Sequence, residues 1–111
     1  MLDSEIPGEF EQLVLLAIVR LGSDAYGVSI RREIEDGAQR RVTPGALYTT
    51  LERLEQKGRL KSREGEATPV RGGRAKRFYQ LTGLGRERLI RSQRALQRLL
   101  QGTGLLEEQH G

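Results

Sequence analysis

The sequence predicts a mainly α-helical domain with a small β component, in the order helix, helix, helix, strand, strand, helix. Three observations predict it. Apolar residues recur at helical spacing over the first half of the chain, two short strand-like runs follow, and another helical pattern ends it. A chain of 111 residues is expected to form one small core. We therefore expect a three-helix core, a two-stranded hairpin and one additional helix.

The first predicted helix spans residues 8–21 and is apolar on more than one side. Its main apolar face follows the i, i+3, i+4, i+7 pattern and consists of Phe10, Leu13, Val14, Ala17, Ile18 and Leu21. Leu15 and Leu16 form a second apolar face, which needs a second cover. We expect another subunit to provide that cover.

Ser23 or Asp24 is expected to cap a second helix, which ends near Gly37. The residues of this helix that point inward are predicted to be Tyr26, Ile30 and Ile34.

The third predicted helix, residues 43–58, has the clearest boundaries. Thr43 suits the N-cap and Pro44 the first helical position, while Gly58 suits the left-handed residue that follows a helix. Its apolar stripe consists of Leu47, Leu51 and Leu54. The opposite face consists of Gly45, Thr49, Glu52 and Gln56, flanked by Ala46 and Arg53.

That polar face is small near the N-terminal end, which suits the DNA major groove. An ordinary amphipathic surface helix has the same periodicity, so the helix alone does not decide between these interpretations. Tyr48 is expected at the edge of the stripe. There its hydroxyl could reach a phosphate, or its ring could close the edge of the core.

A basic hairpin is predicted next, with strands at residues 60–64 and 75–81 and the segment RGGRAKR before and within the second strand. Arg71 and Arg74 are candidates for minor-groove insertion, because Gly73 and its neighbour let the backbone approach DNA closely. Lys76 and Arg77 are candidates for phosphate contacts. A charged turn can be merely solvated, but its position behind a groove-sized helix favours a winged helix-turn-helix.

Thr82 suits the N-cap of a last helix, which continues to about residue 101. Its apolar stripe has no partner once the core is full, so we expect it to pair across a two-fold axis. The alternative is that it folds back on the first helix. We predict a DNA-binding part at residues 1–81 and a dimerisation part at residues 82–111. The predicted dimer contacts are Leu15, Leu16, Leu89, Leu96, Leu99 and Leu100.

Composition excludes several classes of protein. The net charge of +4 favours an anionic partner. The chain has no cysteine, and its only histidine, His110, is next to the last residue, so we predict no enzyme, no metal site and no cofactor. Without a long apolar run or a signal-peptide pattern, we expect a cytoplasmic protein with no membrane partner.

The chain resembles the PadR-like transcriptional regulators, in the short form that ends soon after the fourth helix. The resemblance is carried by FEQLVLLAIVRLG, AYGVSIRREIE, PGALYTTLERLEQKG and GGRAKRFYQLTGLG. It implies a winged-helix homodimer that usually represses transcription and is released by small molecules. The family's recognition-helix and wing positions fall on Thr43, Gly45, Ala46, Tyr48, Thr49, Arg71, Gly73 and Arg74.

The sequence departs from this pattern in two places. Arg59 replaces a residue that is commonly apolar, so we expect the start of the first strand to be more exposed. The chain has no tryptophan, which argues against the aromatic drug pocket of some short members. An effector could instead enter between the last helices, against Leu89, Leu96 and Leu99.

The predicted function is sequence-specific binding of double-stranded DNA by a homodimeric transcriptional regulator, with a possible small-molecule effector. Its two recognition helices would enter successive major grooves of a pseudo-palindromic operator, about 34 Å apart. The alternatives are a winged-helix module that binds another protein, or one that binds RNA through the same basic surface.

Overall fold

The computed structural model describes residues 6–65 and 76–107. Its elements are α1 (Glu9–Leu21), a short 3-10 turn (Gly22–Asp24), α2 (Gly27–Ala38), α3 (Pro44–Gln56), β1 (Leu60–Glu64), β2 (Arg77–Leu81) and α4 (Gly83–Leu100). The two strands form one antiparallel sheet. The predicted fold class, a winged helix with a last α-helix, is confirmed.

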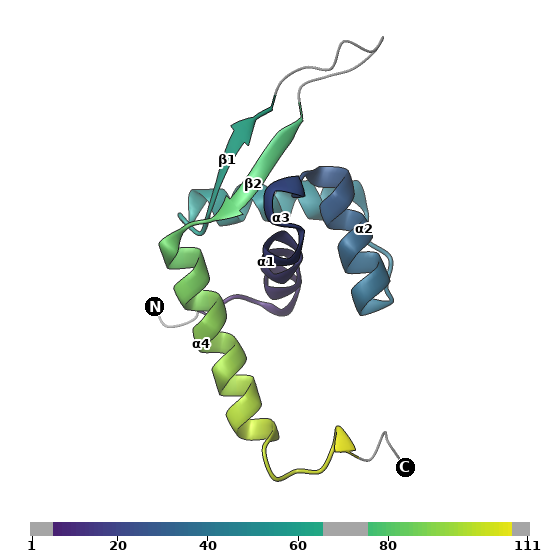
Figure 1. Cartoon of the computed structure of the whole chain (residues 1–111), viewed down its shortest axis with the longest axis vertical. Coiled ribbons are helices and arrows are strands. Elements are labelled where there is room, and N and C mark those ends of the chain that lie inside the picture. Colours follow the sequence, from purple (N-terminus) through teal and green to yellow (C-terminus); the bar gives the residue numbers. More distant parts are fainter. Residues whose placement is uncertain (1–5, 66–75, 108–111) are drawn as a thin grey trace.

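The hairpin and α4 leave the core in opposite directions (Figure 1). Helix α1 lies at the centre, with α2 and α3 around it, and the two strands extend away from this bundle. Helix α4 starts beside the base of the hairpin and runs outward past the core. The fold thus presents a hairpin at one end and a long helix at the other.

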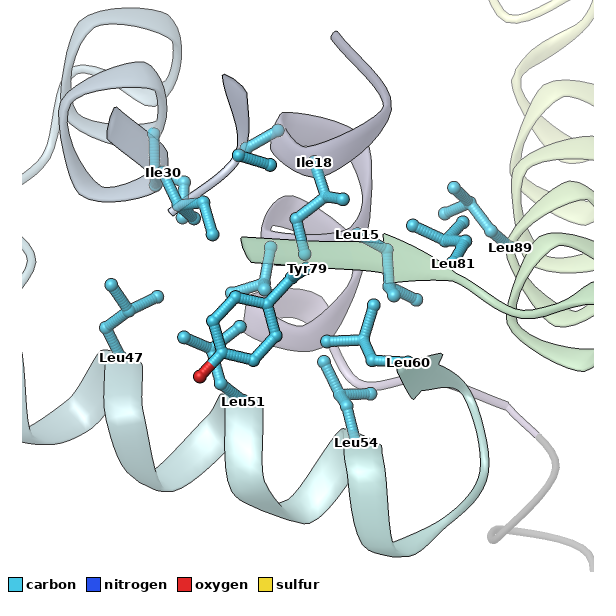
Figure 2. Packing of buried hydrophobic residues seen from close by; sticks show 14 of the residues in the cluster. Leu15, Ile18, Ile30, Leu47, Leu51, Leu54, Leu60, Tyr79, Leu81 and Leu89 are labelled. Carbon is cyan, nitrogen blue, oxygen red and sulfur yellow. The ribbon is translucent and has the colours of Figure 1, made fainter. Parts of the chain in front are cut away.

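The core forms where the leucine stripe of α3 meets α1, α2 and the sheet (Figure 2). Leu47, Leu51 and Leu54 are at most 1% exposed, which confirms the predicted stripe. Leu15 of α1 is also completely buried, and the ring of Tyr79 from β2 lies over α3. Burial of these apolar side chains is the main force that holds the three helices and the hairpin together.

The boundaries of α3 follow its capping residues. The Oγ1 atom of Thr43 accepts a hydrogen bond from the backbone N–H of Ala46 at 3.1 Å. Gly58 has a φ of +76°, the left-handed conformation that glycine adopts without steric cost. Both predicted ends of the helix are therefore confirmed.

The predicted N-cap of α2 was wrong. Ser23 and Asp24 lie in the 3-10 turn, and the cap is Tyr26, whose N–H donates to Oγ of Ser29 at 3.0 Å. The reason is tertiary: the carbonyl of Ala25 accepts a hydrogen bond from Tyr79 of β2 at 2.9 Å. Residues 25 and 26 are thereby held extended against the sheet, and α2 begins after them.

The start of α4 is fastened to the end of α3. Thr82 accepts a hydrogen bond from the N–H of Gly85 at 3.0 Å and donates its hydroxyl to the carbonyl of Gly58 at 2.6 Å. A Cβ at Gly85 would collide with the backbone carbonyl of Arg59. The predicted cap at Thr82 is confirmed, and the helix begins directly after it, at Gly83.

Candidate DNA interface

The N-terminal end of α3 exposes a face without bulky or charged groups. Gly45, Ala46 and Thr49 are exposed, whereas the leucines on the other side of the helix are buried. A Cβ placed on Gly45 would meet nothing within 4 Å. Because only small groups project here, another molecule can approach the helix backbone closely.

Tyr48 lies at the edge of this face and is half exposed. Its hydroxyl is packed directly on Gly27, the first residue of α2, where an added Cβ would collide with it. The side chain therefore covers the junction of α2 and α3, which is the sealing role considered from the sequence. The other role considered, a contact between its hydroxyl and a phosphate, stays a prediction.

The C-terminal end of α3 has a different environment, centred on the buried carboxylate of Glu11 in α1. Nζ of Lys57 lies 3.2 Å from Oε2 of Glu11, and Nη1 of Arg53 lies 4.0 Å from the same oxygen. Nη1 of Arg59 lies 4.0 Å from the other carboxylate oxygen. Arg53, predicted as a DNA contact, is half exposed and is drawn toward α1 by this pairing.

The expectation that Arg59 would leave the first strand more exposed was wrong. Its side chain is only 4% exposed, because Glu11 provides a negative charge and α4 packs over its backbone. A buried charge is tolerated only where it is paired. The sequence gives no direct sign of this pairing, since Glu11 and the basic residues are more than 40 positions apart.

The base of the hairpin is tied to α3 by a chain of polar contacts. Oγ of Ser62 donates to Oε2 of Glu55 at 2.5 Å, and Nη1 of Arg77 donates to Oγ of Ser62 at 2.9 Å. These contacts fix the hairpin relative to the exposed face of α3. Arg77 and Lys76 are both exposed. Nζ of Lys76 lies 4.1 Å from the ring centroid of Tyr26.

The predicted wing-tip residues Arg71, Gly73 and Arg74 lie outside the described residues. Two cations of β1 were missed by the sequence prediction, Lys61 and Arg63, and both are exposed. The guanidinium of Arg63 lies 5.0 Å from the ring centroid of Phe78. The alternation of LKSRE, with one face toward the core, was the signal that could have identified them.

The side chain of Tyr79 points from β2 toward α3 (Figure 2). Burial raises the pKa of Tyr79 above its ordinary value of 10.0, and the nearby carboxylate of Glu55 raises it further. Arg77 opposes this effect. The phenol is therefore neutral at ordinary pH and acts as a packing group.

The residues predicted to form a dimer differ in how far they are exposed. Leu15 and Leu89 are buried within the subunit, so neither is available to a partner in this structure. Helix α1, which carries Leu15, packs against α2, α3, β2 and α4, and these elements supply the cover that was expected from a second chain. Leu100 is partly buried. The exposed members are Leu16, Leu96 and Leu99, at 37%, 56% and 79%.

The two halves of α4 also differ in whether they are covered by the subunit or exposed. Near its middle, Ser92 and Gln93 donate hydrogen bonds to Oε1 of Gln12 in α1, at 3.3 and 2.7 Å. Leu96 and Leu99 continue the face of Leu89 beyond the core, where they are exposed. The first half of α4 thus belongs to the core and the second half projects from it.

Among the described residues, no cluster of three or more histidine, cysteine or acidic side chains could hold a metal ion. His110 lies outside them. None of the described helices is long and apolar enough to span a membrane.

Residues 15–91 match the family model described as the transcriptional regulator PadR-like family. The chain is 39% identical over 77 residues to transcriptional regulator Rv3488 of Mycobacterium tuberculosis, an alignment that covers 69% of this chain and 67% of that protein.

Two solved structures are also similar. A PadR family transcription regulator from Clostridium difficile R20291 is 26% identical with a TM-score of 0.63, over 82% of this chain and 94% of that one. A PadR family transcriptional regulator from Eggerthella lenta is 25% identical with a TM-score of 0.66, over 90% and 87%.

Proposed function

The chain belongs to the PadR-like family of transcriptional regulators, and we propose that it represses transcription by binding duplex DNA as a homodimer. The observation that carries the proposal is the exposed, uncharged N-terminal face of α3, beside a hairpin that carries exposed cations. A helix with this surface can enter the major groove, and the cations can neutralise phosphates on either side.

In this proposal α3 contacts base edges through Gly45, Ala46 and Thr49. Because these residues are small, the helix backbone can come close to the base edges. The hydroxyl of Thr49 would then be the main group that distinguishes one base from another. The phosphate contacts are assigned to Lys76 and Arg77, which are exposed on the hairpin. The remaining assigned contacts are Thr43, Tyr48, Arg53, Arg71, Gly73 and Arg74.

The exposed leucines of α4 support the homodimer. Leu96 and Leu99 project from the core, and Leu105 and Leu106 beyond the helix are also more than half exposed. A shallow groove between α1 and α2, with Leu16 at its edge, offers a further apolar surface. Joining such surfaces across a two-fold axis would remove them from water. Residues 82–111 would then act in dimerisation and residues 1–81 in DNA binding, with the first half of α4 shared by both.

The decisive test is Gly45→Glu. The added side chain has space in the subunit, and an acidic residue in the first turn favours the helix, so folding should be unaffected. In the complex the added carboxylate would face the DNA phosphates, and their repulsion should weaken duplex binding about 100-fold or more. The duplex is selected from a random pool with the parent protein, and binding is measured by fluorescence anisotropy.

Gly83→Glu is the matched control, because it adds the same charge to the first turn of α4, where a Cβ also meets nothing within 4 Å. This variant should bind DNA like the parent. Equal binding by both variants would remove α3 from the interface. Binding of single-stranded RNA in preference to every duplex would favour the RNA alternative, and a protein that binds neither would favour a protein-binding module.

Light scattering tests the dimer separately. The parent should be a dimer and Leu99→Glu a monomer, because an exposed leucine can be replaced without disturbing the subunit core. A monomeric parent would contradict this part of the proposal.

A further inference from the structure

We propose that a hollow on the outer face of the hairpin binds a small amphipathic organic anion. The hollow has a volume of about 580 Å³, a size typical of ligand pockets. Its floor is the sheet, with Lys61, Arg63 and Phe78, and its sides are the end of α1 with Val19 and the start of α4 with Arg86. Three elements that are distant in sequence therefore meet around it.

The charge of this hollow selects an anion. Lys61, Arg63 and Arg86 are exposed, and none of the described residues that line the hollow is acidic. Within the described part of the chain, these three side chains form no ion pair, in contrast to Lys57, which is paired with Glu11. Their unneutralised positive charge favours a carboxylate, sulfate or phosphate group.

The apolar residues that line the hollow favour an anion that also has an apolar part. Val19 is 45% exposed although it follows the buried Ile18, and the ring of Phe78 is only half buried. An aromatic ring or a short alkyl chain laid on these groups would displace water from both, while its charged end met the cations at the rim.

The hollow opens away from the proposed DNA surface. In the strand register, Lys61 and Arg63 alternate with Ser62, which bonds to Glu55 of α3. The hollow is therefore on the side of the sheet opposite α3, and α3 passes behind the hairpin in Figure 1. A duplex seated on α3 would leave this side open for a small molecule.

The position of the hollow gives it a regulatory role, a consequence that rests on the proposed function. A ligand held by β1 and by Arg86 would fix the angle between the hairpin and α4. If that angle differs between the states with and without DNA, the ligand shifts the balance between them. The effector site would then lie within each subunit, and not between the last helices as expected from the sequence.

The test uses 1-anilinonaphthalene-8-sulfonate, an aromatic anion whose fluorescence rises when it enters an apolar site, with the full chain. The double variant Lys61→Gln and Arg86→Gln should weaken dye binding about tenfold, because two charge-assisted contacts are lost. The double variant Arg32→Gln and Arg41→Gln is the matched control, since it also removes two exposed charges and both lie outside the hollow. It should bind the dye like the parent.

Displacement of the dye by two other compounds distinguishes the role of the ligand's charge from the role of its apolar part. Decanoate should displace the dye at much lower concentration than decanol, which has the same chain without the charge. In a nuclear magnetic resonance titration of the parent with decanoate, the largest amide shifts should fall at Val19, Lys61 and Phe78. Equal displacement by decanol, unchanged dye affinity in the double variant, or shifts confined to α4 beyond Ser92 would each overturn the proposal.

DNA binding is measured in parallel, with and without saturating decanoate. A change in duplex affinity supports the regulatory role, and no change overturns that role. A parent that binds the dye as described but no duplex would contradict the proposed function and not the ligand site.

Discussion

The two ends of α3 are built differently. Its N-terminal end exposes Gly45, Ala46 and Thr49. The hydroxyl of Thr43 caps this end by accepting a hydrogen bond from the N–H of Ala46. Its C-terminal end is tied to the rest of the subunit: Lys57 is paired with Glu11, and the carbonyl of Gly58 accepts a hydrogen bond from Thr82 at the start of α4. The difference teaches that the anchoring of this helix is concentrated at the end away from its proposed contact with DNA.

Electrostatics explains why the anchor has this composition. The C-terminal end of a helix carries a partial negative charge and favours nearby cations. Arg53, Lys57 and Arg59 gather there, and the carboxylate of Glu11 gives them a shared partner inside the subunit. Cations held in this way are less available to phosphate than Lys76 and Arg77 on the hairpin.

Gly85→Ala should have the largest effect on the anchored end. The new methyl group would collide with the backbone carbonyl of Arg59, which cannot move without shifting the end of α3. We expect the free energy of unfolding, measured by urea denaturation, to fall by about 3 kcal/mol. Gly83→Ala, in the same turn but facing open space, should be neutral or stabilising by up to about 1 kcal/mol. Similar losses in both variants would contradict the close packing at Gly85.

Glu11→Gln should have an intermediate effect. It removes the charge that pairs with Lys57 and with the buried Arg59, and we expect a loss of about 2 kcal/mol in the same urea measurement. The control is Glu9→Gln on the same helix, whose exposed pair with Arg40 should contribute no more than about 0.5 kcal/mol. If the two changes were equally mild, the anchor would not depend on Glu11.

Tyr79→Phe should have the smallest effect and report on the middle of α3. Because burial raises the pKa of Tyr79 in the folded state, the folded protein keeps the phenol proton where the unfolded chain loses it. This difference in proton binding stabilises the folded state fully at pH values below the pKa of the phenol in the unfolded chain. The free energy of unfolding should therefore fall as the pH rises above about 10. Urea denaturation at several alkaline pH values should show a shallower fall for the phenylalanine variant. An identical pH dependence would mean that Tyr79 is solvated.

Local features of this protein were predictable because neighbouring residues decide them. The spacing of Leu47, Leu51 and Leu54 placed one side of α3 in the core, and the Thr43 cap set its start. The alternation at residues 60–64 predicted β1 with its observed bounds. The predicted N-cap of α2 was wrong because Ala25 pairs with β2, a strand more than 50 residues later in the chain.

The sequence by itself determined the helices, the hairpin and the apolar faces, since each depends on periodicity and on capping within a few residues. Only the tertiary structure decided which apolar or charged residues are covered by the chain itself. Leu15 is inside the subunit and Leu99 is outside it, although both are leucines on apolar helix faces. Arg59 is buried because folding brings Glu11 to it across the core. Burial is a property of contacts between distant segments, and a local pattern does not specify which segments will meet.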